Sequence, residues 1–243
     1  DPPYSSEERF IVNIVSRPLP KRMPVVMWGV GGVENVVKEM ERLRYIGFTH
    51  CLGTATDFAK VWEAGAPVQA ASDEALPAAY AMLDQALVNG VGIIAGLSPG
   101  RWAASKEEIR QTLRDGTRHD EVDGLYPKAQ DFCYNVGVSA SQTYGDFPAF
   151  AGAMIHTEVR GHSRPSFGEI DRQAFKASSG LEIPDEVEIG NGVRYADLKD
   201  FPPDRIIPDD HPILLYYKWF WQQGDGWNAL HTALDRGLKT NVH

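Results

Sequence analysis

The chain has 243 residues, 43% of them hydrophobic and 23% charged, which is typical of a soluble globular protein with a sizeable core. The formal net charge is −9 and no basic block occurs, which argues against a nucleic-acid or anionic-membrane partner. No apolar run is long enough to span a bilayer. We expect no cofactor, because Gly29, Gly31 and Gly32 do not fit the dinucleotide-binding fingerprint.

The two cysteines, Cys51 and Cys133, are too few for a disulfide framework or a four-thiolate zinc site. We therefore expect both to be buried thiols, and the redox compartment stays open. The chain starts at Asp1 without a methionine, which slightly favours a secreted or periplasmic protein that has lost a signal peptide over a cytoplasmic one.

The first half of the chain alternates between strand and helix patterns. Residues 1–22 are expected to form a lead-in with one short strand. Strands are predicted near residues 25–28, 49–53 and 92–95, and helical spacing of apolar residues is found over 33–46 and 73–89. This order predicts a parallel sheet wound by helices. A loop is expected over residues 59–72, around Trp62.

The next segment is expected to be mostly irregular. The pattern of residues 105–108 is a capping box and predicts a short helix that ends at Gly116. A polar loop is then expected as far as Asn135, followed by a short helix over residues 139–144. Residues 167–178 are expected to be helical, residues 187–195 to form a hairpin, and residues 213–238 to form one long helix interrupted near residues 224–226. Its tryptophans, Trp219, Trp221 and Trp227, are expected to pack against the barrel or a partner.

Residues 151–161 carry the strongest functional signal. They begin as a small, apolar, buried strand near residues 153–157 and then turn polar. Strand alternation places His156, Glu158 and Arg160 on one face. An imidazole, a carboxyl and a guanidinium at a strand end are typical of an active site in a (β/α)8 barrel, where chemistry sits at the C-terminal ends of the strands. The alternative is a solvated Glu158–Arg160 pair at an ordinary strand end.

The predicted fold class is therefore α/β, of the (β/α)8 TIM-barrel type. Only four strand–helix units and the first residues of a fifth strand, at residues 241–243, can be placed, whereas a closed barrel needs eight. We expect residues 23–243 to form the N-terminal half of such a barrel, with a long insertion at residues 181–212. An open sheet remains the alternative.

Residues 144–152, which lead into Ile155, His156, Thr157 and Glu158, resemble the retaining (β/α)8 glycoside hydrolases of clan A, most closely the family 42 β-galactosidase group. The resemblance extends over residues 126–181. It implies that Glu158 is the general acid/base at the end of strand four. Thr157 stands where the clan has asparagine, and the nucleophile, which the family carries on strand seven, falls outside this chain.

Further substrate-binding candidates lie near the predicted strand ends. Sugars stack on aromatic faces and hydrogen-bond to planar polar groups, so the expected subsite residues are those with such side chains near the predicted rim. They are Trp28, Asp57, Arg101, Trp102, Asn135, His156 and Arg160.

Two other classes of function remain open. A metal-dependent barrel hydrolase would use His156 and Glu158 with His50 or His162, although the His-x-His expected after the first strand is absent. A non-catalytic carbohydrate- or partner-binding fragment is the other alternative. The expected partners are a carbohydrate substrate and the remaining half of the barrel or a second protein chain.

Overall fold

The computed structural model describes residues 23–30, 32–155, 164–188, 206–224 and 229–241. These residues form two compact units. We call residues 23–54, 73–95 and 147–152 the sheet unit, because they contain most of the parallel sheet. Residues 55–72, 96–146 and 153–241 form the helical unit.

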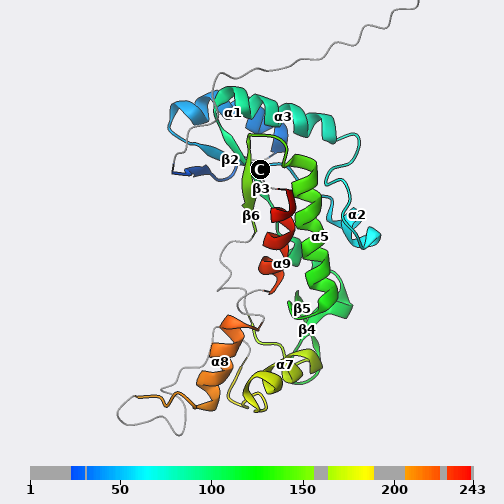
Figure 1. The fold of residues 1–243 in the computed structure, drawn as a ribbon, viewed down its shortest axis with the longest axis vertical. Helices are drawn as coiled ribbons and strands as arrows, with labels where there is room; N and C mark the ends of the chain where they lie inside the picture. The colour runs from blue at the N-terminus through cyan, green and yellow to red at the C-terminus, as the bar shows by residue number, and fades with distance from the viewer. Residues whose placement is uncertain (1–22, 31, 156–163, 189–205, 225–228, 242–243) are drawn as a thin grey trace, which may run out of the picture. The chain divides into compact units, whose positions relative to one another are not determined.

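The sheet has four strands in the order β1-β2-β3-β6, namely Val26–Met27, His50–Gly53, Gly92–Gly96 and Phe150–Met154 (Figure 1). β1 pairs with β2, and β2 with β3, in parallel. β6 joins in the same direction, since Ile93 N donates to Ala149 O at 2.7 Å and Leu97 N to Met154 O at 2.9 Å. The predicted parallel, sequential strand order is therefore confirmed.

The last strand differs from the sequence expectation in two respects. It begins at Phe150 rather than near residue 153, because the apolar run already starts there. It is also not buried: Ala151 is exposed and the other residues of β6 are only half-buried. An edge position in the four-stranded sheet accounts for this, because among the described residues only β3 pairs with β6.

Two helices pack together in the sheet unit, α1 (Gly32–Tyr45) and α3 (Leu76–Asn89), and Figure 1 shows them side by side. Both match the helices predicted from apolar periodicity. Their buried residues recur every three or four positions, at Val36, Met40 and Leu43 in α1 and at Ala79, Met82, Leu83 and Ala86 in α3. α3 ends at Gly90, whose φ of 69° is favourable for glycine.

A close approach between β2 and β3 explains one glycine of the sheet. His50 pairs in register with Gly92, and a Cβ at position 92 would overlap the imidazole ring of His50. The His50 Nδ1 lies 2.8 Å from Thr49 Oγ1, which holds the ring in place. Burial lowers the pKa of His50 from its ordinary value.

The helical unit contains five longer helices and one hairpin in its described part. The helices are α2 (Phe58–Ala64), α5 (Pro127–Tyr144), α7 (Glu169–Ser179), α8 (Pro212–Gln222) and α9 (Ala229–Leu238). A short helix, α4 (Pro99–Ala103), two 3₁₀ turns (Glu107–Ile109 and Lys239–Asn241) and the antiparallel strands β4 (Arg110–Thr112) and β5 (Arg118–Val122) complete it.

α5 and α9 pack directly on each other through glycines (Figure 1). A Cβ at Gly137 of α5 would overlap the carbonyl oxygen of Leu234, and one at Gly237 of α9 would overlap the carbonyl oxygen of Tyr134. Side chains at these two positions would push the helix axes apart. At these two glycines the helices are therefore in direct backbone-to-backbone contact.

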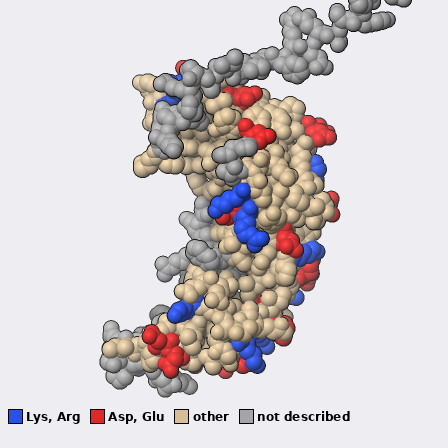
Figure 2. All heavy atoms as spheres, in the orientation of Figure 1, with Lys and Arg blue, Asp and Glu red and all other residues tan. Residues whose placement is uncertain are grey.

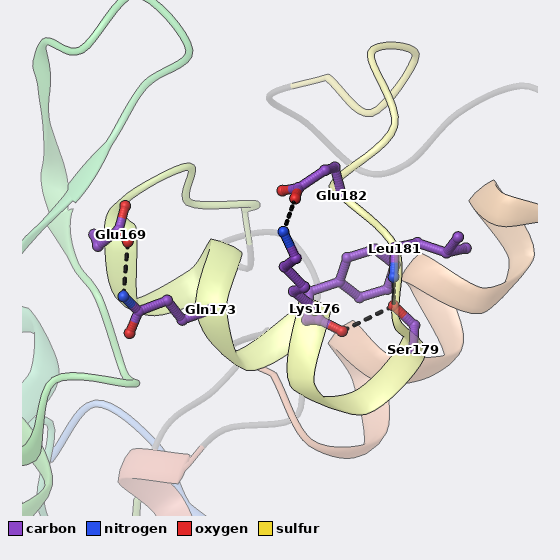
Figure 3. Close-up of polar contacts among 7 residues, drawn as sticks. Glu169, Gln173, Lys176, Ser179, Leu181 and Glu182 are labelled. Atoms are coloured by element: carbon purple, nitrogen blue, oxygen red, sulfur yellow. Dashed lines mark hydrogen bonds and ion pairs between the residues drawn. The ribbon is translucent and has the colours of Figure 1, made fainter.

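α7 and α8 share a second apolar cluster. Its buried members are Phe167, Phe175, Val187, Tyr216, Trp219 and Phe220, and Trp221 packs against it. Trp219 is buried in this cluster and Trp221 is half-buried against it, whereas Trp227 lies outside the described residues. Packing of the three tryptophans against a barrel or a partner stays a prediction. The C-terminal end of α7 is closed by Ser179, whose Oγ donates to Phe175 O and accepts from Leu181 N (Figure 3).

Three local predictions are wrong. The expected helix after residue 105 is a 3₁₀ turn, which ends at the buried Ile109, followed by the β4–β5 hairpin, in which Gln111 is buried. The expected polar loop up to Asn135 is the first half of α5, which starts with Pro127 at its first position. Part of the expected loop at residues 59–72 is α2. The helical stretch expected over residues 213–238, with its interruption near residues 224–226, is confirmed: α8 ends at Gln222 and α9 begins at Ala229.

Both cysteines are buried and free, as expected. Burial raises the pKa of Cys51 to about 11 and that of Cys133 to about 12. Most of the hairpin predicted at residues 187–195 lies outside the described part, because residues 189–195 are not described. No helix within the described ranges is long and apolar enough to cross a membrane.

Candidate functional site

The three strongest candidates from the sequence, His156, Glu158 and Arg160, lie within residues 156–163, outside the described part of the chain. Their roles therefore stay predictions. The chain on either side is described. On the N-terminal side, Met154 is the last residue of β6, so Glu158 follows that strand by four positions.

On the C-terminal side the chain is bound to the β4–β5 hairpin. Gln111 Nε2 donates to Arg164 O at 3.1 Å, and Phe167 N donates to Thr112 O at 2.8 Å. The guanidinium of Arg164 also lies 3.1 Å from His119 Nε2. The segment that carries Glu158 thus leads from a sheet strand to a second, hydrogen-bonded attachment in the helical unit.

A buried polar group of residues strengthens this attachment. Ser166 Oγ donates to Asp123 Oδ2 at 2.9 Å and accepts from Thr112 N at 3.2 Å. Asp123 also accepts from Leu125 N at 3.0 Å, and its side chain is fully buried. Buried carboxylates need such donors, because an unpaired charge in the interior is strongly destabilising. These hydrogen bonds therefore connect the β4–β5 hairpin to the chain segment around Ser166.

Two of the predicted subsite residues follow strands β1 and β2 along the chain. Trp28 comes directly after β1 in the sheet unit and is 55% exposed. Asp57 follows β2 and belongs to the helical unit, where its carboxylate caps α2 by accepting from Lys60 N at 3.0 Å. Asp57 therefore has a structural role as a helix cap, in addition to the sugar-binding role predicted for it.

The other predicted residues are in the helical unit. Arg101 and Trp102 both lie in α4, which follows β3 along the chain; Arg101 is exposed and Trp102 is half-buried. Asn135 is half-buried in the interior of α5 rather than in a loop before the last strand. Of the predicted residues, Trp102 is the one that the structure brings together with other aromatic side chains.

An aromatic cluster surrounds Trp102. We use this name for four residues from α2, α4 and α5: Phe58, Trp62, Trp102 and Phe132. The ring centroids of Trp62 and Trp102 are 6.0 Å apart, and those of Trp62 and Phe132 are 5.2 Å apart at an angle of 79°. Within the cluster Phe132 is buried, whereas both indoles are half-buried and so keep part of their surface in solvent. Half-exposed indoles are the kind of surface on which a sugar ring can stack.

Two ammonium groups lie over these indoles. Lys106 Nζ is 4.9 Å from the ring centroid of Trp102 and 5.5 Å from that of Trp62, and Lys128 Nζ is 4.4 Å from that of Trp62. Lys128 Nζ also donates to Glu108 Oε1 at 2.9 Å. The hydrogen bond from Lys128 lowers the pKa of Glu108, and the positive charges of Lys128 and Lys106 act in the same direction.

Sequence reasoning missed Trp62, Lys106, Lys128 and Glu108. The four-residue spacing of Phe58 and Trp62 was a detectable helical signal, since side chains at this spacing share one face of a helix. The contribution of Lys128 and Phe132 could not be seen, because no pattern in the sequence links α5 to α4 or to the more distant α2.

A groove of about 320 Å³ lies in the sheet unit between β1 and α1. It is lined by Met27, Gly29, Val30, Asn35, Lys38, Glu39, Arg42, Leu43 and Ile46. Several large apolar side chains of this region are exposed, among them Val25, Trp28, Val37 and Ile46. Nothing in the groove lining resembles a catalytic pair of carboxylates.

The described residues give no support to the metal-dependent alternative. Among residues that the structure describes, no three His, Cys, Asp or Glu side chains gather as metal ligands would. His50 contacts Thr49 instead. His156, Glu158 and His162 are outside the described ranges.

On the face shown in Figure 2, Lys and Arg side chains are interspersed with Asp and Glu.

Comparison with known proteins gives limited guidance. No protein-family model matches the chain, and no curated protein matches it in sequence. A solved structure, the cold-adapted β-galactosidase from Rahnella sp. R3, aligns with 68% of this chain at a TM-score of 0.45 and 12% sequence identity. The chain spans 26% of the length of that enzyme. This score is too low to establish a common fold, so what the chain itself shows is a mixed α/β fold with a parallel four-stranded sheet.

Proposed function

We propose that this chain is part of a retaining β-glycosidase that hydrolyses glycosides or oligosaccharides, β-galactosides in particular, with Glu158 as the general acid/base. One observation carries the proposal. The polar sequence His156, Thr157, Glu158 begins two positions after Met154, the end of the last strand of a parallel sheet whose strands come in sequential order. In parallel α/β enzymes, chemistry belongs to residues that follow strand ends. The sequence resemblance over residues 126–181 supports the same role.

The proposed chemistry needs two carboxyl groups about 5–5.5 Å apart. One attacks the anomeric carbon to form a glycosyl–enzyme intermediate. Glu158 would first donate a proton to the leaving oxygen and then, as a carboxylate, remove a proton from the water that hydrolyses the intermediate. The nucleophile is expected from a part of the enzyme that this chain does not contain.

Neighbouring residues have proposed supporting roles. His156, two positions before Glu158, would orient the carboxyl or hydrogen-bond a sugar hydroxyl. Arg160 would favour the ionised form of Glu158 if its guanidinium lay close, so it serves the second step better than the first. Trp28, Asp57, Arg101, Trp102 and Asn135 are the proposed contacts to the sugar.

The catalytic unit is proposed to need more strands than this chain supplies. Within the described ranges no strand pairs with the outer edge of β1, and exposed Val25 and Trp28 lie beside that edge. Open sheet edges next to apolar surface are normally covered in soluble proteins. We propose that another polypeptide segment, the remaining half of a barrel or a second chain, pairs there.

Hydrolysis assays test the function. The chain alone, and then the complete enzyme that contains it, is incubated with aryl β-galactosides and the anomeric configuration of the first product is followed by NMR. The proposal expects turnover by the complete enzyme with retention of configuration, and little or none by the chain alone. Inversion would contradict the retaining mechanism. Turnover that chelators abolish and Zn²⁺ restores would favour the metal-dependent alternative, and sugar binding without any turnover would favour a binding fragment.

A further inference from the structure

We propose that the aromatic cluster and its two lysines form a subsite for an acidic sugar, one whose ring carries a carboxylate. The proposal rests on the proposed function for its carbohydrate context and adds the charge of the substrate. The proposed subsite consists of Trp62, Trp102, Lys106 and Lys128, which all belong to the helical unit.

The first step of the argument is electrostatic. Lys106 and Lys128 lie over the same Trp62 ring, so their ammonium groups are no more than roughly 10 Å apart, about one Debye length, and their repulsion is not fully screened. Glu108 offsets the charge of Lys128 at 2.9 Å. No carboxylate within the described ranges is at ion-pair distance from Lys106. The single carboxylate of Glu108 thus faces two ammonium groups, and an anionic ligand would supply a second negative charge.

The second step is the geometry of the donors. An ammonium group has three N–H donors, and contact with an indole face occupies one side of it. Lys106 is half-buried and is held between two indoles, so less side-chain entropy is lost when its remaining donors bind a ligand than for a freely mobile lysine. Hydrogen bonds from ammonium to carboxylate are among the stronger ones in proteins.

The third step selects a sugar rather than a simple anion. The half-exposed indoles of Trp62 and Trp102 offer apolar surface beside the ammonium groups, and the C–H face of a pyranose suits such surface. The whole chain carries a charge of −9, which repels long polyanions. One carboxylate on a stacked sugar ring therefore fits this site better than a highly charged polymer does.

Calorimetric titration of the full chain tests the proposal without any turnover. The ligands are an acidic trisaccharide in which one ring is galacturonic acid and two are galactose, a neutral galactose trisaccharide and inorganic sulfate. We expect the acidic trisaccharide to bind at least tenfold more tightly than the neutral one, since each charge-assisted hydrogen bond contributes about a factor of ten. Sulfate should bind more weakly still. Equal affinity for both trisaccharides, equal affinity for sulfate, or no binding would overturn the proposal.

Variants separate the subsite from a structural role. Lys106→Gln should weaken binding of the acidic trisaccharide about tenfold, whereas Lys106→Arg should keep it. Glu108→Gln should strengthen binding, because it removes a competing carboxylate from Lys128. The matched control is Lys176→Gln on α7, whose lysine is exposed and paired with Glu182 (Figure 3) and which should leave binding unchanged. An unchanged affinity in Lys106→Gln, or a weaker one in Glu108→Gln, would contradict the proposal.

Failure of this proposal and failure of the proposed function give different results. A complete enzyme that hydrolyses neutral galactosides, combined with no preference for the acidic trisaccharide, would refute the subsite alone. Tight binding of the acidic trisaccharide by a chain whose complete protein hydrolyses no glycoside would refute the hydrolase and leave the subsite in place.

Discussion

At the scale of single residues, position 92 shows how tightly β2 and β3 approach each other. Gly92→Ala places a methyl group into the His50 ring, which must move away from Thr49 or distort the strand pair. Overpacking of this kind costs about 1–3 kcal/mol of unfolding free energy. Urea unfolding followed by circular dichroism measures the loss.

Gly96→Ala, in the same strand, is the control, because a Cβ there meets no atom within 4 Å. It should change the unfolding free energy by less than about 0.5 kcal/mol. A loss in Gly96→Ala as large as that in Gly92→Ala would show that any side chain weakens β3, independently of His50.

The half-buried His50 should make stability depend on pH. Its pKa is lower in the folded protein than the ordinary value of 6.5, because burial disfavours the charged imidazolium. Above pH 6.5 both states hold the ring neutral. Below it the unfolded chain binds more protons, so unfolding becomes easier as the pH falls towards the folded pKa. The full stabilisation is therefore present above pH 6.5 and is lost on acidification.

Unfolding of the native chain and of His50→Gln across pH 5 to 8 isolates this contribution. The difference in unfolding free energy between the two proteins should be constant above pH 6.5. Below pH 6.5 the native chain should lose stability relative to His50→Gln. A difference that stays constant over the whole range would contradict the lowered pKa.

At the scale of elements, the α5–α9 pair is the clearest case of packing that depends on glycine. Gly137→Ala should force the two helices apart, because the new methyl group overlaps the backbone of α9 rather than a side chain that can rotate away. We expect a loss of about 3 kcal/mol in unfolding free energy, at the upper end of overpacking effects. Gln142→Ala, at an exposed position of α5, is the matched control and should be nearly neutral or slightly stabilising. Equal effects of the two variants would contradict the close crossing.

The elements also show where sequence patterns succeed and fail. β1, β2, β3, α1 and α3 were predicted correctly because each has its own periodic pattern of apolar residues and a glycine end. The β4–β5 hairpin was missed, because Ser105 to Glu108 has the local pattern of a helix start, while the strands are fixed by contacts to distant Ser166 and Phe167. The aromatic cluster could not be predicted either, since three separate helices build it.

At the scale of the whole molecule, the open edge of β1 predicts association. The described sheet has four strands, whereas a closed barrel needs eight, and apolar side chains such as Trp28 and Ile46 are exposed around β1 and α1. We expect the isolated 26.9 kDa chain to self-associate or to bind its complementary polypeptide. Light scattering coupled to size exclusion measures this. A stable, well-folded monomer over a wide concentration range would contradict it.

The proposed role of Glu158 has a measurable consequence for the complete enzyme. Glu158→Gln removes the proton donor and, later, the base that activates water. Alkyl galactosides, which have poor leaving groups, should lose turnover by about 10²- to 10⁴-fold. Dinitrophenyl galactoside needs little protonation, so its first step should be largely retained.

Azide rescue of that variant is the most direct test of the central claim. Azide attacks the glycosyl–enzyme intermediate without a general base, so it should restore turnover of dinitrophenyl galactoside and yield β-galactosyl azide. Equal losses on alkyl and dinitrophenyl substrates, with no azide product, would contradict the assignment of Glu158 as the acid/base.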